Sequence, residues 1–268
     1  MIDPVVDAEW LAANRDGVVL ADVRWYLDGR SGLQAYEKGH LPGAVFIDLD
    51  TALARHGSAA EGRHPLPEPD VFAAAMAAAG IGDETRVIAY DDAGGVIAAR
   101  LVWMLRATGH DAALLDGGVK AWTGDLVTEV PEVRPATFTA RDWPAARIAT
   151  LEEAVTGPVV LDARDRSRFR GDEEPVDPRP GHIPGARNLP CRENLTADGR
   201  FLPVADLRER FAAAGADGSA EVISYCGSGV TACHNLIAME HAGLGEGRLF
   251  PGSWSQYANT GRPAATGD

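Results

Sequence analysis

Cys226 lies in the stretch of sequence whose residue types best suit covalent chemistry. Val222–Tyr225 has the apolar composition of a short buried strand, and Ala232–His241 has that of a helix. Between them, Cys226 is followed by Gly, Ser and Gly. A thiolate between a strand and a helix is stabilised by loop amides and by the helix dipole, and glycine allows N–H groups to turn inward. The pattern therefore predicts a reactive thiolate, although an isolated buried cysteine is also compatible with a structural role.

The predicted active-site loop continues beyond the cysteine. It comprises Gly227, Ser228, Gly229, Val230 and Thr231. The hydroxyl of Ser228 can donate a hydrogen bond within this loop. We therefore expect the loop itself to offer the sulfur only backbone amides and one hydroxyl, because none of its side chains is charged.

The other two cysteines are expected to be chemically inert. Cys233 lies within the predicted helix and Cys191 follows Pro190. The spacing of Cys226, Cys233 and His234 does not match a zinc site. The sequence thus predicts neither a metal nor a cofactor.

The composition limits the possible partners and location. The 268 residues are enough for one large or two modest domains, and the formal net charge is −14. This acidic balance argues against nucleic acids and anionic membranes as partners. We expect no signal peptide and no transmembrane segment. Three cysteines, an odd number, fit free thiols in a reducing compartment, so a cytoplasmic location is predicted.

Segments of the first half recur in the same order in the second half, at offsets of about 135 to 142 residues. The pairs are 18–24 with 159–164, 39–44 with 181–186, 86–90 with 221–225, and 114–118 with 249–253. We interpret them as two copies of one domain. Each copy alternates short apolar strands with helical stretches, which predicts an α/β fold with a parallel sheet and helices on both faces. Asp70 and Asp206 are expected to cap helices.

The domain organisation follows from this repeat. The first copy is expected to span 1–123 and the second 144–268, with a proline-containing extended linker at 124–143. Asp91 occupies the position that Cys226 has in the second copy. A carboxylate cannot accept a sulfur atom, so the first copy is predicted to be non-catalytic.

Together these features resemble the two-domain rhodanese-type sulfurtransferases. The resemblance includes the two Gly-His-hydrophobic-Pro-Gly-Ala turns and Gly252-Ser253-Trp254, and it covers nearly the whole chain. The loop from Cys226 to Thr231 is similar to that of the 3-mercaptopyruvate sulfurtransferases. The resemblance implies that Cys226 takes sulfur from a donor as a persulfide. It also implies that cyanide or a thiol, such as that of a thioredoxin-like protein, accepts the sulfur.

The resemblance also implies roles for residues outside the loop. Ser228 would act in a proton relay with a histidine and an aspartate of the first copy, which correspond to His40 and Asp28. Arg168, within an arginine-rich stretch, would bind the anionic donor, with Arg179 as a second candidate. An arginine suits this task because guanidinium binds a carboxylate or sulfonate at two points.

Three alternatives remain at this point. Thiosulfate-preferring rhodaneses usually carry Arg and Lys where this chain has Gly227 and Ser228, so 3-mercaptopyruvate is the preferred donor and thiosulfate the alternative. A non-catalytic sulfur carrier would keep Cys226 without turnover. A cysteine-dependent phosphatase would need arginine six positions after the cysteine, where Ala232 stands.

Overall fold

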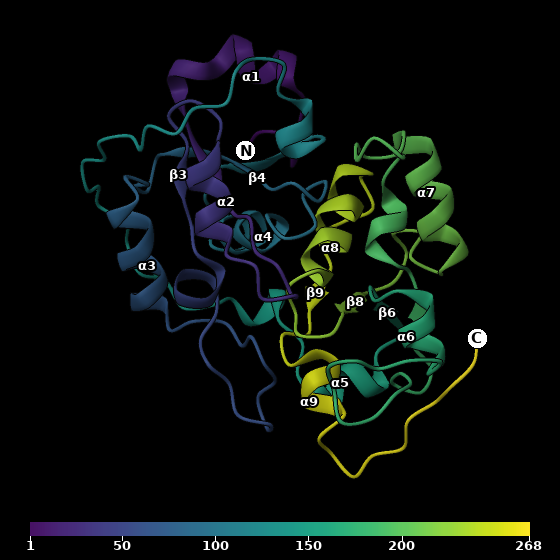
Figure 1. Cartoon of the computed structure of the whole chain (residues 1–268). Coiled ribbons are helices and arrows are strands. Elements are labelled where there is room, and N and C mark those ends of the chain that lie inside the picture. Colours follow the sequence, from purple (N-terminus) through teal and green to yellow (C-terminus); the bar gives the residue numbers. More distant parts are fainter. The chain divides into compact units, whose positions relative to one another are not determined.

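The computed structural model describes residues 1–268, which divide into two compact units. Unit 1 contains Met1–Arg55, Pro67–Trp143 and Thr196–Phe201. Unit 2 contains His56–Leu66, Pro144–Leu195 and Leu202–Asp268. Each unit has its own parallel sheet and its own helices (Figure 1), which confirms the predicted α/β class.

The sheet of unit 1 has five strands in the order β1-β5-β4-β2-β3, all parallel. The register pairs Val18 with Arg86 and Asp22 with Tyr90, so β2 and β4 end at the same edge. The elements are β1 (Val5–Val6), α1 (Ala8–Asn14), η1 (Arg15–Gly17), β2 (Val18–Asp22), α2 (Gly32–Lys38), β3 (Val45–Phe46), η2 (Leu49–Leu53), α3 (Pro69–Ala78), β4 (Arg86–Tyr90), α4 (Ala99–Ala107), β5 (Ala112–Leu115) and η3 (Gly118–Ala121).

The sheet of unit 2 has four parallel strands in the order β7-β6-β8-β9. Ile148 adds a single parallel bridge to Leu249, in the place that β1 takes beside β5. The elements are η4 (Ala145–Arg147), α5 (Leu151–Thr156), β6 (Val159–Asp162), α6 (Arg166–Arg170), β7 (Arg187–Asn188), η5 (Cys191–Asn194), α7 (Val204–Ala213), β8 (Val222–Tyr225), α8 (Ala232–His241), β9 (Arg248–Leu249) and α9 (Ser253–Tyr257). Helices α7 and α8 lie side by side within this unit (Figure 1).

The helix starts differ slightly from the sequence-based expectation. Asp70 and Asp206 were expected as caps, but α3 begins at Pro69 and α7 at Val204, so both aspartates lie inside the first turn. Proline suits the first helical position because its missing N–H has no partner there anyway. The acidic side chains still complement the helix dipole from that turn.

The repeat is visible as matching contacts in the two units. The carboxylate of Asp22 pairs with Arg24 at 2.6 Å, and that of Asp162 pairs with Arg164 at 2.6 Å. Each arginine also donates to the carbonyl of the first glycine in the Gly-His-hydrophobic-Pro-Gly-Ala turn, Gly39 or Gly181. A buried ion pair therefore ties the end of the first long strand to this turn in both units.

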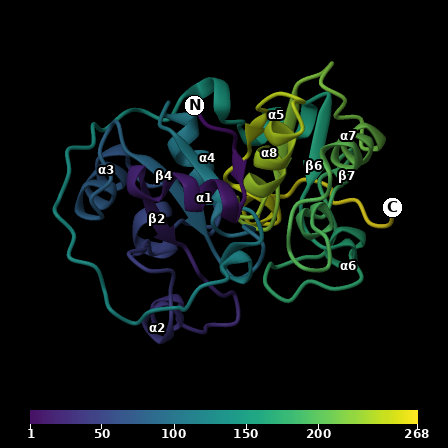
Figure 2. The ribbon, with the colours of Figure 1, turned by 90° about the horizontal axis from the view of Figure 1, so that it is seen from above.

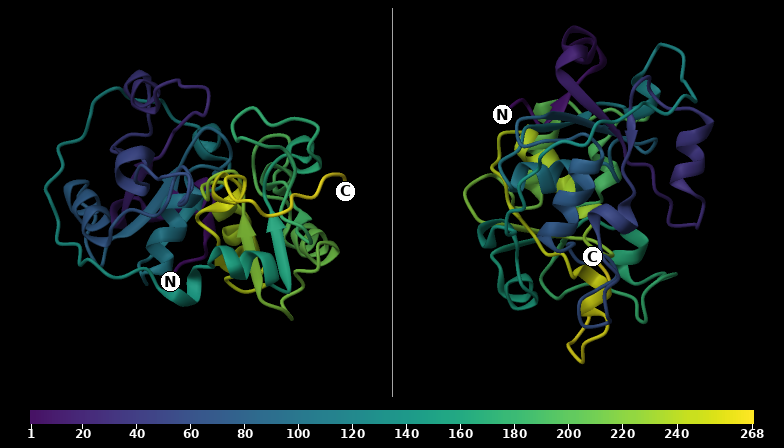
Figure 3. Two further views of the ribbon diagram at one scale, coloured as in Figure 1. Left: turned by 90° about the horizontal axis from the view of Figure 1, so that it is seen from below. Right: turned by 90° about the vertical axis from the view of Figure 1, so that its left-hand side faces the viewer.

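The segment 124–143, expected as a linker, runs in an extended path along unit 1, past α2 and α3 (Figures 2 and 3). Its backbone pairs at Val127 with His40, and Ala136 N–H donates to the Ala77 carbonyl at 2.9 Å. The change of unit falls between Trp143 and Pro144. None of the helices combines the length and the hydropathy that a bilayer span requires.

Two short segments cluster with the unit other than the one their sequence position suggests. Residues 56–66 precede α3 of unit 1 but belong to unit 2, and residues 196–201 belong to unit 1. The first of these segments packs on α9: the Arg63 N–H donates to Ser255 Oγ at 3.0 Å. This segment brings residues from the first half of the chain to the cysteine loop.

Candidate functional site

The site is built at the end of β8. Parallel pairing with β6 and β9 fixes β8, whose last residue, Tyr225, pairs with Asp162 of β6. Cys226 follows directly, and α8 begins at Ala232. The Cys226 residue is only 2% exposed, and the Gly229 N–H donates to its Sγ at 3.1 Å. A backbone amide aimed at sulfur stabilises a thiolate, as the sequence predicted for this loop.

Glycine at position 229 has a local structural cause. Its φ of +80° lies in the left-handed region, and a Cβ there would lie 2.6 Å from the Pro251 carbonyl oxygen. Any other residue would be strained and would collide with backbone. Gly229 therefore allows the turn that points its amide at Cys226.

The first residues of α9 hold the cysteine loop from the other side. Ser253 Oγ accepts from Cys226 N–H at 3.1 Å and donates to the Phe250 carbonyl at 2.9 Å. Trp254 N–H donates to the Cys226 carbonyl at 2.9 Å. Ser253 itself has a φ of 52°, the only positive φ outside glycine in the chain. Such strain concentrates at functional sites, and here it places the hydroxyl under the cysteine backbone.

Ser228 contacts a histidine that the sequence interpretation missed. Its Oγ lies 2.8 Å from Nδ1 of His64. His64 comes from the segment 56–66 and is separated from Ser228 by 164 positions. A hydroxyl in contact with an imidazole can pass a proton, so the pair can serve as an acid–base relay.

Two guanidinium groups lie over Gly227. A Cβ built at this glycine would lie 3.1 Å from Arg63 Nη2 and 3.4 Å from Arg168 Nη1. Both belong to unit 2. Arg168 was expected beside the loop; Arg63 was not. The loop itself is uncharged, but two cations reach it from outside.

Two buried carboxylates hold these arginines. Glu174 accepts from Arg168 Nη2 at 2.6 Å, and Asp177 pairs with both Arg168, at 3.3 Å, and Arg63. Burial acts to raise the pKa of Glu174, but Arg168 and the backbone N–H groups of Asp177 and Val176 together hold it below its usual range. Burial raises the pKa of Asp177, against the attraction of Arg63.

The remaining arginines of the cluster have other partners. Arg166 is exposed and pairs with Glu193. Arg179, the second candidate for donor binding, donates to the carbonyls of Tyr257, Ala258 and Arg262 at 2.7–3.1 Å. This guanidinium thus fastens the C-terminal segment.

His40 and Asp28, expected in the relay, lie in unit 1 with other contacts. The His40 ring is buried, stacks on Tyr36 and has both nitrogens within hydrogen-bond distance of carbonyl oxygens. His182 is buried in the same turn of unit 2 and stacks on Phe169, with a matching Nδ1 contact. Because both copies share this arrangement, it is explained by packing of the turn. Asp28 is exposed and pairs with Arg30 at 2.9 Å.

The other two thiols differ from Cys226. Burial raises the pKa of Cys191 to about 12. Cys233 is buried in α8, and its Sγ donates to the Gly229 carbonyl at 3.4 Å. Neither has the strand-end position ahead of a glycine turn that Cys226 has.

In unit 1 the corresponding loop is closed around a carboxylate. Asp91 is fully buried and accepts four backbone N–H groups, from Ala93, Gly95, Ile97 and Ala98, at 2.7–2.9 Å. Burial raises the Asp91 pKa and these four bonds oppose the rise. The loop type thus surrounds acceptor atoms with amides, and in unit 1 its own side chain supplies the acceptor oxygens.

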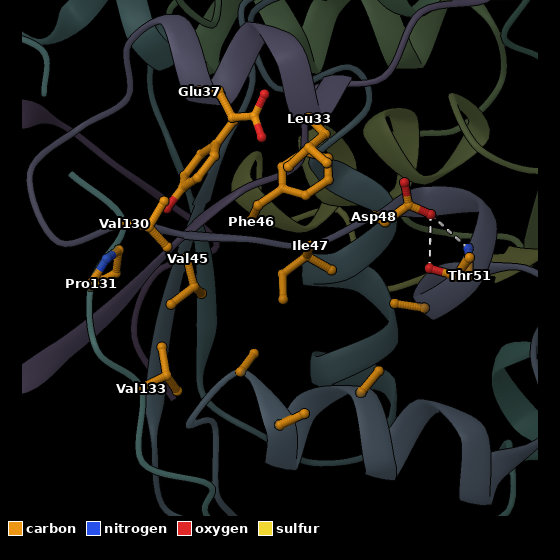
Figure 4. A pocket seen from close by; sticks show the side chains of 15 residues that line it. Leu33, Glu37, Val45, Phe46, Ile47, Asp48, Thr51, Val130, Pro131 and Val133 are labelled. Carbon is orange, nitrogen blue, oxygen red and sulfur yellow. Dashed lines mark hydrogen bonds between the residues drawn. The ribbon is translucent and has the colours of Figure 1, made fainter. Parts of the chain in front are cut away.

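Unit 1 also contains an apolar cavity of about 420 Å³ (Figure 4). It is bounded by α2, β3, α3 and the extended segment at Val130–Val133. The lining residues with polar side-chain groups are Tyr36, Glu37, Asp48 and Thr51. Of these, Tyr36 donates to the Ala44 carbonyl, and Asp48 caps η2 by accepting from Thr51. This cavity lacks the thiol, imidazole and guanidinium groups gathered around Cys226.

The rhodanese-like domain family matches this chain twice, at residues 7–125 and 147–260. A relative from Pseudomonas aeruginosa, provisionally named a 3-mercaptopyruvate sulfurtransferase, is 41% identical over 98% of both chains. A relative from Mycobacterium tuberculosis, provisionally named a thiosulfate sulfurtransferase, is also 41% identical, over 91% of this chain and 89% of its own. The solved 3-mercaptopyruvate sulfurtransferase from Leishmania major has a TM-score of 0.85 and 33% identity, covering 97% of this chain and 75% of that one.

The chain therefore belongs to the rhodanese-like family, with two domains in tandem. Within that family it is a sulfurtransferase, and the resemblance inferred from the sequence is confirmed.

Proposed function

We propose that this sulfurtransferase moves sulfur from 3-mercaptopyruvate to a thiol or to cyanide, through a persulfide on Cys226. The observation that carries the proposal is the environment of Cys226: an amide on Sγ, a Ser228–His64 pair and two guanidinium groups over Gly227. These supply, in turn, anion stabilisation, a proton route and a site for a carboxylate.

In the first step the Cys226 thiolate attacks the thiol sulfur of the donor. The S–S bond forms while the donor C–S bond breaks, and the electron pair of that bond leaves as the enolate of pyruvate. The proton from the donor thiol then goes to the enolate carbon. The products are pyruvate and a persulfide anion, so no oxidant or reductant is consumed.

Ser228 and His64 can deliver the proton that the first step requires. The leaving enolate needs a proton at carbon, and the Ser228 hydroxyl, 2.8 Å from the His64 ring, can deliver one and be reprotonated. Thiosulfate would release sulfite as an anion and would need no such delivery. A relay beside the loop is therefore better matched to 3-mercaptopyruvate.

In the second step an acceptor thiolate or cyanide attacks the outer sulfur of the persulfide. The S–S bond breaks and its electrons return to Cys226 as thiolate. The loop amide that faces Sγ stabilises the sulfur in both forms. A thioredoxin-like protein is the class of thiol acceptor proposed.

Thiosulfate remains the second candidate donor because Arg63 and Arg168 bring positive charge to Gly227. Two buried carboxylates, Glu174 and Asp177, offset that charge one for one. A cluster with no net charge discriminates against a dianion more than against the single carboxylate of 3-mercaptopyruvate. The charge balance thus favours the mercaptopyruvate donor.

Steady-state kinetics with both donors, using cyanide as acceptor, tests the proposal. We expect a higher kcat/KM for 3-mercaptopyruvate. Preference for thiosulfate would overturn the donor assignment. Release of a single equivalent of thiocyanate from protein preloaded with sulfur, without turnover on either donor, would instead identify a sulfur carrier.

A further inference from the structure

We propose that the apolar cavity of unit 1 binds an amphiphilic cation, that is, a small molecule with an apolar body and one positively charged group such as an amine. The cavity volume of about 420 Å³ lies within the range that is typical of small-molecule sites. All of its lining residues belong to unit 1, and none of them has a role in the proposed sulfur transfer. The inference is therefore independent of the proposed function.

The walls of the cavity suit the apolar part of such a ligand. The side chains of Val45, Ile47 and Val133 surround the open space (Figure 4). Helix α3 contributes only alanines to the wall, Ala75 and Ala78, so it leaves free the space that longer side chains would fill. An apolar ligand placed there exchanges water for contacts with several elements at once.

Large apolar side chains at this cavity are exposed to water. Leu33 is 46% exposed, Val130 is 62% exposed and Val133 is 36% exposed, and all three belong to the lining. Single exposed apolar residues are common on soluble proteins, whereas several around one hollow are typical of a binding site. Their burial against a ligand would contribute to the free energy of binding.

The charged side chains of the lining are both carboxylates. Glu37, on α2, is exposed and takes part in no ion pair or hydrogen bond of its side chain. Asp48 accepts both bonds from Thr51 at Oδ1, which leaves Oδ2 for another donor. No lysine, arginine or histidine lines the cavity. The lining therefore attracts a cation and repels a carboxylate, including that of 3-mercaptopyruvate.

The test measures the binding of decylamine, which is a cation at pH 7, to the full chain by titration calorimetry. Decanol and decanoate have the same chain length and are neutral and negatively charged, respectively. Ala75→Leu fills part of the cavity; its control is Ala74→Leu, the same change at an exposed position of α3 outside the lining. Glu37→Gln removes one carboxylate charge. Circular dichroism and melting temperature verify that each variant folds.

Decylamine is expected to bind at one site, about threefold or more tightly than decanol and about tenfold or more tightly than decanoate. Ala75→Leu should weaken decylamine binding by about tenfold, because the added side chain occupies the place of the ligand, and Ala74→Leu should leave it unchanged. Glu37→Gln should lower the preference for decylamine over decanol by about twofold or more.

Methyl NMR of the unchanged protein locates the bound ligand without any substitution. Titration with decylamine should shift the methyl signals of Val130 and Val133. It should leave those of Val71 in place, because this exposed valine lies on α3 outside the lining. The location of the site is thus tested even if Ala75→Leu fails to fold.

Absence of saturable decylamine binding, equal affinities in Ala75→Leu and Ala74→Leu, or shifts that spare Val130 and Val133 would overturn the site. Decanol or decanoate binding as tightly as decylamine would overturn its preference for a cation. None of these results would affect the proposed function, which concerns the chemistry of Cys226.

Discussion

Replacement of Arg168 by alanine tests which arginine of the arginine-rich stretch binds the donor. Arg168 has a nearly buried side chain, and its Nη1 lies near the Gly227 position. Arg166, two residues earlier, is 53% exposed at its side chain and pairs with Glu193 on the surface. The two substitutions remove the same charge from the same short helix, α6, but from different surroundings.

The expected magnitude follows from these contacts. Only one nitrogen of Arg168 is not committed to Glu174 or Asp177, so its loss removes one charged hydrogen bond to the donor. Such a bond contributes about 1.5–3 kcal/mol, which corresponds to a rise in KM of about 10- to 150-fold. Arg166→Ala removes a surface ion pair of about 0–1 kcal/mol and should leave KM unchanged.

The assay is the initial rate of pyruvate release against 3-mercaptopyruvate concentration, with thermal unfolding to verify folding. Glu174 keeps a partner in Arg168→Ala, because Arg164 also pairs with it at 3.2 Å. Glu174 is therefore not left as an isolated buried charge. Equal effects of Arg168→Ala and Arg166→Ala on KM would refute the assignment of Arg168 to the anion site.

Three further predictions concern other parts of the chain. His64→Ala should lower kcat with 3-mercaptopyruvate by about 100-fold and kcat with thiosulfate much less, because only the enolate needs a proton. The control is His56→Ala, at an exposed histidine of the same segment. Equal losses of kcat with both donors would exclude a relay. Asp91→Ala should lower the free energy of unfolding by at least about 3 kcal/mol, since four buried N–H groups lose their acceptor. Asp92→Ala removes one hydrogen bond from Tyr26 and should lower it by about 1 kcal/mol. Similar chemical-denaturation midpoints for the two variants would contradict the stabilising role of the four bonds to Asp91. Cys191 should resist iodoacetamide at pH 8 in the folded protein, because a pKa raised to about 12 keeps the thiol neutral there, and peptide mapping should find it alkylated only after unfolding.

Periodicity and repetition were sufficient to predict the central strands of both sheets, but not the two-residue strands β1, β3 and β7. The recurrence of Val18–Arg24 as Val159–Arg164 has a direct physical basis, since both segments end in a buried Asp–Arg pair that anchors the same turn. The strand before Cys226 was predicted with its observed bounds, Val222–Tyr225. These features are local, so composition and spacing record them.

The residues that reach the loop from elsewhere could not be predicted in this way. His64 meets Ser228 across 164 positions, and Arg63 meets Asp177 across 114. Neither lies in a segment that recurs. The signal available was the Arg-His pair between Gly62 and Pro65, a turn-like stretch with no counterpart in the repeat.

The histidine chosen from the sequence illustrates the same limit. His40 lies in a recurring turn, and recurrence marks what both copies need for packing, as the matching contacts of His182 show. A residue needed by only one site is more readily found among the features that the copies do not share. Two such unshared features are Asp91, which takes the place of Cys226 in the first copy, and Arg63, which lies in a segment with no counterpart in the second copy.

Whether sulfur passes through Cys226 can be measured by intact mass spectrometry of the protein after exposure to 3-mercaptopyruvate. We expect the added mass of one sulfur atom, located by peptide mapping on Cys226 and removed by cyanide. It should be absent from Cys226→Ser, which should remain folded but inactive. Sulfur on Cys191 or Cys233, or retained transfer by Cys226→Ser, would contradict this expectation.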